Sequence, residues 1–241
     1  MLLLAFSPQS ESKRACPSYL ILISSAMPDK YRNFKHLLQH ETEGEDFEIA
    51  YQPRNSDILV MAPHGGRIEP YTGELAEMIA NDTFSCYVFK GIKRNGNRSL
   101  HITSHCFDEP VAIQAVQGAG LVLTVHGEGN PNHAFIMVGG THKPLCSAME
   151  TRLSVMGTDV RPPPKGMAAK HPLNICNRGK SGKGVQLELS CKLRLLLKND
   201  TRWQRQFADT VRAVLLEKAG MERSVFTAEI TEKPLRTQRM F

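Results

Sequence analysis

Short apolar runs that suit β-strands recur along the chain between stretches with helical spacing. Residues 57–62 and 120–125 are nearly uniform apolar runs, as expected of strands that are buried on both faces of a sheet. Residues 185–189 alternate apolar and polar side chains, which predicts a third strand. Shorter runs at residues 87–89 and 100–103, separated by a polar turn, predict two further strands.

Helical spacing of apolar residues fills most of the intervals between these strands. It predicts helices over residues 30–39 and 109–117, one that begins near residues 70–72, and a long amphipathic helix over residues 200–219. The proline-rich residues 156–176 predict a loop that lines a site. Strands that alternate with helices are typical of an α/β fold, and 241 residues suit one domain. We therefore predict a single α/β domain with parallel strands.

The first 26 residues do not fit this alternation. Two short apolar runs are separated by a mostly polar stretch that contains Pro17, so the apolar core of a signal peptide is broken. We expect residues 1–26 to form a disordered or poorly docked extension and residues 27–241 to form the domain.

The charge of the chain is net basic but dispersed. A formal charge of +6 and a pI near 9.0 favour polyanionic partners in general. Basic residues are scattered and aromatic residues make up only 7% of the chain, which argues against a stacking surface for nucleic acid. We therefore expect an acidic partner that is not a nucleic acid.

Cysteine usage and hydropathy narrow the class of protein further. The six cysteines are widely spaced and form no CxxC pair, so reduced thiols are expected rather than disulfides or a cysteine-zinc site. No apolar run approaches the roughly 18 residues that a membrane span needs. We expect a monomer that is made in the cytoplasm and has no membrane anchor, with release from the cell left open.

Two histidines each follow a predicted buried strand, and each is followed by glycine: His64 and His126. In open α/β sheets, ligands collect beyond the carboxyl ends of the strands, so both imidazoles enter one crevice if these strands are neighbours. Glu69 comes five residues after His64, and Gly65 and Gly66 permit a tight turn that returns its carboxylate. Two histidines, one carboxylate and an open position form a catalytic zinc arrangement. The sequence thus predicts Zn²⁺ at His64, Glu69 and His126, with satisfied or solvated histidines as the alternative.

The third predicted strand carries a candidate general base. Strand alternation places Gln186 and Glu188 on the face opposite its apolar residues. A carboxylate in so apolar a strand is expected either to pair with a polar or charged group or to serve a function. Glu188 is therefore a candidate base for activating water, and a salt bridge is the alternative. Glu74, Glu128 and Asp108 are the other carboxylates near the predicted crevice.

Taken in order, six short motifs resemble the phage-type poly-γ-glutamate hydrolases, whose Bacillus relatives are often labelled phage-related replication proteins. The resemblance covers about residues 30–219, and the ordered set is more specific than any one motif. The motifs are HGGRIEP (64–70), LHITS (100–104), FDEP (107–110), VHG (125–127), NRG (177–179) and GVQLEL (184–189).

This resemblance implies a fold similar to the zinc carboxypeptidases, with a mixed, mostly parallel sheet flanked by helices. Carried over residue by residue, it implies His64, Glu69 and His126 as zinc ligands and Glu188 as the general base. The substrate class that it implies is a γ-linked glutamyl polymer or a γ-glutamyl peptide. The ligand pair departs from the carboxypeptidase His-x-x-Glu spacing, and no counterpart is evident for the arginines that hold a terminal carboxylate in those enzymes.

Other residues offer rival roles. His101 and His105 bracket the end of a predicted strand and could supply a different third ligand. Arg178 precedes the Glu188 strand and is a candidate for binding a substrate carboxylate or the oxyanion by bidentate hydrogen bonds, with an ordinary surface role as the alternative.

Two functions compete with cleavage of the polymer. A zinc amidohydrolase could act instead on small acylated amino acids or on γ-glutamyl peptides of the cell wall. A nucleic-acid-binding replication accessory protein, as the label on the relatives suggests, would need none of the three candidate ligands and should bind DNA in a salt-dependent manner.

Overall fold

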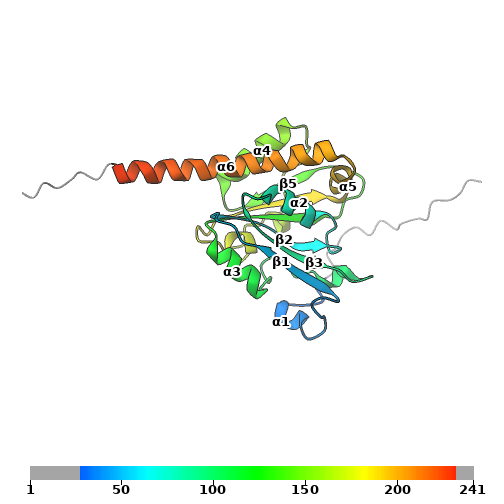
Figure 1. Ribbon diagram of the computed structural model, residues 1–241. Coiled ribbons are helices and arrows are strands. Elements are labelled where there is room, and N and C mark those ends of the chain that lie inside the picture. Colours follow the sequence, from blue (N-terminus) through cyan, green and yellow to red (C-terminus); the bar gives the residue numbers. More distant parts are fainter. Residues whose placement is uncertain (1–27, 232–241) are drawn as a thin grey trace, which may run out of the picture.

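Figure 1 shows the computed structural model, which describes residues 28–231, with side chains as far as residue 220. The extension and the signal peptide considered for residues 1–26 lie outside this range. The α-helices are α1 (Phe34–Leu37), α2 (Thr72–Ala80), α3 (Pro110–Gly118), α4 (Lys143–Val155), α5 (Cys191–Asn199) and α6 (Thr201–Thr231). The strands are β1 (Phe47–Gln52), β2 (Ile58–Gly66), β3 (Ser85–Gly91), β4 (Leu121–Glu128), β5 (Ile136–Gly140), β6 (Val160–Arg161) and β7 (Val185–Ser190). Short 3-10 helices cover Asn97–Leu100, Lys165–Met167 and Ile175–Asn177.

Within the described residues, seven strands form one mixed sheet in the order β1-β3-β2-β4-β7-β5-β6. The central strands β3, β2, β4 and β7 run parallel to one another. On the flanks, β1 pairs antiparallel with β3, and β5 pairs antiparallel with β7. The expected α/β domain with a mixed, mostly parallel sheet is confirmed. Because β2, β4 and β7 are parallel neighbours, their carboxyl ends meet at one edge of the sheet.

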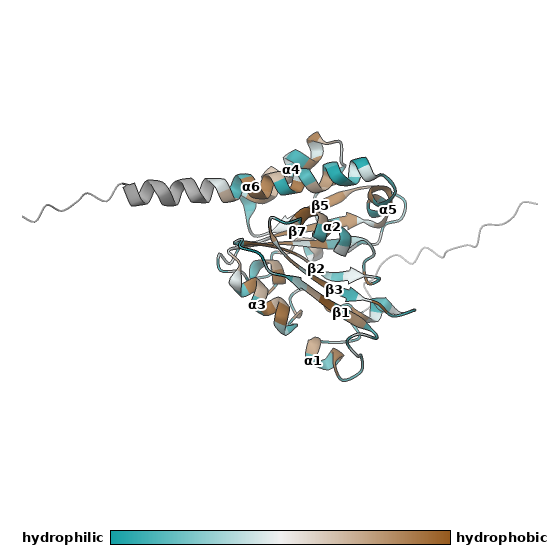
Figure 2. Ribbon diagram, viewed as in Figure 1, coloured by the Kyte–Doolittle hydropathy of each residue, from teal (hydrophilic) through white to brown (hydrophobic). Residues whose placement is uncertain are grey.

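Helices cover both faces of the sheet (Figure 1). On one face, α2, α4, α5 and α6 bury apolar side chains against the strands, among them Leu75, Met149, Leu193 and Phe207. On the other face, α1 and α3 pack together with the segment that follows β3. The strands between these two layers are the most hydrophobic part of the fold (Figure 2).

The uniform apolar run predicted at residues 57–62 is explained by burial on both faces. Leu59 and Met61 of β2 contact the core beneath α1 and α3, whereas Val60 and Ala62 contact the core beneath the other helices. All four side chains are at most 1% exposed. A strand with two buried faces has no position for a polar residue until it reaches the sheet edge, where His64 lies.

The strand predicted at residues 100–103 is wrong. A 3-10 helix ends at Leu100, and the next residues are extended without pairing to the sheet. The alternation is real, because Leu100 and Ile102 are both fully buried in the core. The polar positions, however, bond to Asp29: its Oδ1 lies 2.6 Å from His101 Nδ1, and its Oδ2 accepts from the Thr103 amide at 2.5 Å. The carboxylate of Asp29 thus bonds the polar groups of this segment, which would otherwise be available to a neighbouring strand.

The helix predicted over residues 30–39 is confined to Phe34–Leu37. Asn33 caps its first turn by accepting a hydrogen bond from the His36 amide at 2.9 Å. Beyond the helix the chain turns, because the buried carboxylate of Glu41 is held by Lys93 and by Lys30, the latter at 3.3 Å. The other predicted helices are confirmed, whereas the patterns of β1, β5, α4 and α5 were not identified from the sequence.

The state of the cysteines and the character of the helices follow from the described residues. Their cysteines are free thiols, and two of them, Cys86 and Cys176, are buried. In residues 28–231, no helix combines the length and the apolar character needed to cross a bilayer.

A buried carboxylate joins α3 to the sheet and provides a test of the packing. Glu109 accepts hydrogen bonds from the amides of Val111 and Ala112 at 2.9 and 2.7 Å and from the Tyr87 hydroxyl at 2.7 Å. Glu109→Ala should lower the free energy of unfolding by about 2–4 kcal/mol, because the helix cap is lost and the Tyr87 hydroxyl is left unpaired. Tyr87→Phe, which removes one of the three bonds, should cost less. Urea denaturation of both variants measures this, and equal losses would contradict the account.

Candidate metal centre

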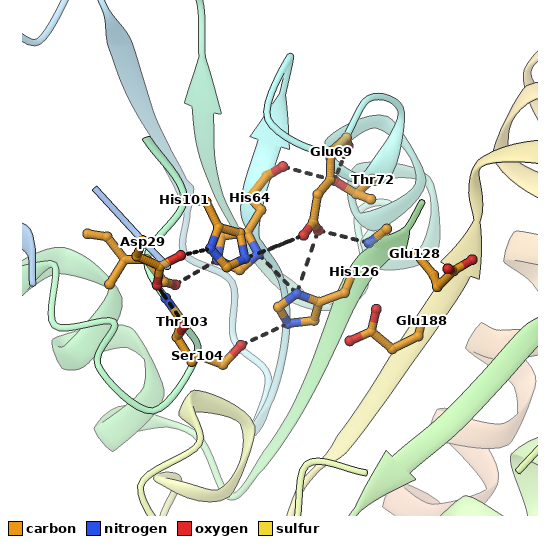
Figure 3. A network of polar contacts seen from close by, with 12 residues as sticks. Asp29, His64, Glu69, Thr72, His101, Thr103, Ser104, His126, Glu128 and Glu188 are labelled. Atoms are coloured by element: carbon orange, nitrogen blue, oxygen red, sulfur yellow. Dashed lines mark hydrogen bonds and ion pairs between the residues drawn. The ribbon is translucent and has the colours of Figure 1, made fainter. Parts of the chain in front are cut away.

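The ends of three parallel strands bring together the polar residues that the sequence predicted. His64 lies near the end of β2, His126 near the end of β4, and Glu188 near the end of β7. His126 and Glu188 are register partners on neighbouring strands, so their side chains project to the same face of the sheet. The side chains face a common region (Figure 3), and exposure of the three residues is 1%, 3% and 7% respectively.

Glu69 reaches this region through the turn that follows β2. Gly66 has a φ of +63°, a conformation that favours glycine, and a Cβ there would overlap the backbone of Gly91. The turn is closed by a hydrogen bond from the Glu69 amide to the His64 carbonyl at 2.9 Å, and the Thr72 hydroxyl donates to the Glu69 carbonyl at 2.8 Å. The local backbone therefore returns the Glu69 carboxylate to the imidazole of His64, as predicted.

The Nδ1 atoms of His64 and His126 and the carboxylate of Glu69 face one another. Nδ1 of His64 lies 3.1 Å from Oε1 of Glu69 and 3.1 Å from Nδ1 of His126, and His126 Nδ1 lies 3.6 Å from Oε2 of Glu69. Tetrahedral zinc with bonds of 2.0–2.1 Å separates its ligand atoms by roughly 3.3 Å. The spacing of this group therefore suits a small divalent cation.

The surrounding hydrogen bonds favour the protonation state that metal binding needs. Nε2 of His64 lies 2.9 Å from the carbonyl oxygen of Ile102, which can only accept, so Nε2 carries the proton. In the neutral ring, Nδ1 then presents a lone pair to the carboxylate of Glu69. His64 Nδ1 and Glu69 Oε1 both carry lone pairs and lie only 3.1 Å apart. Their close approach requires a proton or a metal ion between them. The donor set fits Zn²⁺.

The carboxylates of Glu69 and Glu188 are in opposite electrostatic situations. Burial alone would raise the pKa of Glu69, but the imidazoles of His64 and His126 lower that pKa well below its usual value. Burial raises the pKa of Glu188 well above its usual value, and the negative charge of Glu69 adds to the rise, while Arg194 opposes it. The partner of Glu188 is a neutral amide, because Nε2 of Gln186 donates to its Oε1 at 2.8 Å. The ionised form of Glu69 is therefore favoured, whereas burial favours the protonated form of Glu188.

Comparison with known protein families assigns the chain to one of them. A family model described as poly-gamma-glutamate hydrolase matches residues 31–217 of the chain. The chain belongs to the poly-γ-glutamate hydrolase family. UPF0714 protein YmaC of Bacillus subtilis (strain 168) is 36% identical over 169 residues, which span 69% of this chain and 71% of YmaC. UPF0714 protein YndL of the same strain is 34% identical over 171 residues, which span 69% of this chain and 66% of YndL.

Solved structures of similar proteins share the fold of this family member. A bacteriophage poly-γ-glutamate hydrolase superposes with a TM-score of 0.75 at 30% identity, covering 80% of this chain and 100% of the other. A zinc-free form of YndL superposes with a TM-score of 0.72 at 29% identity, covering 79% of this chain and 99% of the other.

The rival histidines of this family member lie beside the group of three rather than within it. The ring of His101 lies against that of His64 at a tilt of 36°, with centroids 4.0 Å apart, and its Nε2 is 3.8 Å from Oε1 of Glu69. Burial and the neighbouring His64 lower the pKa of His101 to about 4, although Asp29 opposes that change. His105 is exposed and stacks on His171 at 5.1 Å. His101 is therefore a neighbour of the candidate ligands, and His105 lies further out.

The other residues singled out from the sequence have separate contacts. Arg178 donates through Nη1 to the Phe107 carbonyl at 2.9 Å, which ties it to the loop after β3. Asp108 accepts from the Phe34 amide at 2.6 Å and so anchors α1. Glu74 is exposed on α2. Glu128, at the end of β4, accepts from the Asn130 amide at 2.8 Å and lies near Glu188 (Figure 3).

Sequence reasoning missed Asp29, Ser104 and Arg194. Asp29 orients His101, and the Ser104 hydroxyl lies 3.5 Å from Nε2 of His126. Arg194, on α5, is only 6% exposed and lies against the ends of the strands. A single aspartate or serine in a loop, and an arginine in an amphipathic helix, give no sequence signal, because their partners are set by tertiary structure.

Proposed function

We propose that this protein hydrolyses γ-glutamyl amide bonds of poly-γ-glutamate, with Zn²⁺ held by His64, Glu69 and His126 and with Glu188 as the general base. The observation that carries this proposal is the position of Glu188, a buried carboxylate in register with His126 and paired only with an amide. Such a carboxylate beside a candidate metal group is typical of water activation in hydrolases. Membership of the family supports the choice of substrate.

The metal ion and Glu188 have separate roles in the proposed reaction. When bound, Zn²⁺ would polarise the scissile carbonyl and lower the pKa of a water molecule. Oε1 of Glu188 accepts a hydrogen bond from Gln186, which leaves Oε2 to act as the base. Oε2 takes a proton from the attacking water while the water oxygen forms a bond to the amide carbon. Glu188 then gives this proton to the departing nitrogen as the carbon–nitrogen bond breaks, which restores the carboxylate. Burial of Glu188 favours its protonated form during the reaction.

The charge of the chain supports an acidic polymer as substrate. Poly-γ-glutamate carries one free carboxylate per residue, and a protein with a formal charge of +6 attracts such a polyanion at long range. In the proposed reaction, Arg178 is a candidate for contacting a substrate carboxylate at the rim, although one of its donors is taken by Phe107. Contacts of this kind at the surface are screened by salt.

The substrate assignment predicts selective cleavage. The zinc-loaded protein should shorten poly-γ-glutamate and release new amino groups, whereas α-linked polyglutamate, with the same charge, should stay intact. Gel filtration and amine titration measure both reactions, and the rate on the polymer should fall as ionic strength rises. An intact polymer alongside hydrolysis of small acylated amino acids would favour the rival amidohydrolase.

The ligand assignment predicts that His126→Ala loses zinc and activity together, because two remaining ligands hold zinc poorly. His133→Ala is the matched control, since His133 is exposed in the loop before β5. Equilibrium dialysis against a competing chelator gives the zinc content of both variants. One zinc ion per chain in His126→Ala would overturn the assignment and shift attention to His101.

The assignment of the base predicts a different outcome for Glu188→Gln. The substitution keeps the shape and removes the base, so zinc content should remain near one per chain while turnover falls by on the order of 10²-fold or more. Glu128→Gln is the control, because Glu128 is the carboxylate at the end of the neighbouring strand. If Glu128→Gln lost turnover and Glu188→Gln kept it, the base would be Glu128. Loss of zinc in Glu188→Gln would make Glu188 a ligand.

A further inference from the structure

Arg194 lies buried on α5 and contacts the segments that carry the candidate metal ligands. Its Nε donates to the carbonyl of Pro70 at 2.9 Å. Its Nη1 donates to the carbonyl of Glu128 at 3.1 Å and also to the carbonyl of Leu189. One guanidinium therefore bonds to three backbone carbonyls that are far apart in the sequence.

Each of these carbonyls belongs to a segment that carries a residue of the site. Pro70 directly follows Glu69, Leu189 directly follows Glu188, and Glu128 lies two residues after His126. A guanidinium is planar, and its donors have a fixed geometry, so it sets the separation of the groups that it joins. Arg194 thus connects the segments of two candidate metal ligands to the segment of the proposed base.

The neighbouring backbone is built to admit this side chain. Gly127 lies against the guanidinium, and a Cβ at this position would overlap Nη1 and the central carbon of Arg194. The Gly127 amide in turn donates to Oε2 of Glu69 at 2.8 Å. Because Gly127 has no side chain, it can lie against Arg194 while its own amide donates to the carboxylate of Glu69.

The buried charge of Arg194 is compensated by the same hydrogen bonds. The three carbonyl oxygens that accept from Arg194 replace the water molecules that its guanidinium loses on burial. A hydrophobic side chain of the same length would supply neither the donors nor the charge.

We infer that Arg194 is a positioning residue, which holds the proposed base at a fixed distance from the candidate metal ligands. This role rests on the proposed function, because it concerns the separation of Glu188 from Glu69 and His126. Within the part of the chain that the structure describes, the hydrogen bonds of Arg194 go to backbone carbonyls, so we assign it an action through other residues and not on substrate. A displacement of about 1 Å in a reacting group can lower turnover by on the order of 10²-fold, which makes the separation consequential.

Arg194→Met tests this inference, with Arg212→Met as a matched control. Arg212 on α6 also donates to two backbone carbonyls, those of Ile79 at 3.0 Å and of Met78, but these lie at the end of α2 that is remote from the site. Both variants should be less stable than the parent protein. Zinc affinity, turnover and KM should be measured for both at a temperature where each is fully folded.

The two variants should differ in their effect on the site. Arg194→Met should weaken zinc binding by about 10- to 100-fold and lower turnover by on the order of 10-fold or more, with little change in KM. Arg212→Met should leave all three quantities near those of the parent protein. If Arg194→Met matched Arg212→Met in zinc affinity and turnover, the role of Arg194 would be purely structural and the inference wrong. A rise in KM at constant turnover would also overturn it.

A conservative variant covers the case in which Arg194→Met does not fold. Lysine keeps the charge but lacks the fixed fork, so Arg194→Lys should fall between Arg194→Met and the parent protein in zinc affinity and turnover. Values equal to those of the parent would overturn the inference. Zinc affinity needs no substrate, so the positioning of the ligands is tested even if the protein binds zinc without cleaving poly-γ-glutamate.

Discussion

The contact between His64, Glu69 and His126 is the constraint around which the carboxyl edge of the sheet is arranged. The Nδ1 atoms of His64 and His126 lie 3.1 Å apart, and each lies 3.1–3.6 Å from a carboxylate oxygen of Glu69 in a buried region; such a group is stable only around a cation. The turn at Gly66 and the Thr72 hydroxyl position Glu69, and the Ile102 carbonyl orients the imidazole of His64.

Glu188 places a second buried carboxylate in the same region, close to Glu69. A carboxylate buried near Glu69 is costly when ionised, and its pKa is raised as a result. Proteins retain such groups where function requires them, at the expense of stability. The buried guanidinium of Arg194 partly offsets this repulsion and also joins the strand ends by hydrogen bonds. Metal binding, base strength and strand spacing are therefore coupled in one small volume.

Sequence reasoning recovered the parts of this arrangement that depend on local pattern. The apolar runs that became β2 and β4 ended in His64 and His126, and the glycines after His64 indicated the turn that returns Glu69. It failed where tertiary contacts decide. Residues 101–103 have the alternation of a strand, yet a carboxylate far away in sequence takes up their polar groups. Arg194 reads as one more basic residue of an amphipathic helix, because its carbonyl partners lie on other segments.

The most direct test is the X-ray absorption spectrum of the zinc-loaded protein, which reports the atoms bound to the ion. The account predicts two imidazole nitrogens and additional oxygen ligands at about 2.0–2.2 Å, with no sulfur at about 2.3 Å. A sulfur ligand would place the ion at a cysteine instead, and a third imidazole would bring in a histidine beyond His64 and His126. Either spectrum would contradict the assignment of the metal centre to His64, Glu69 and His126.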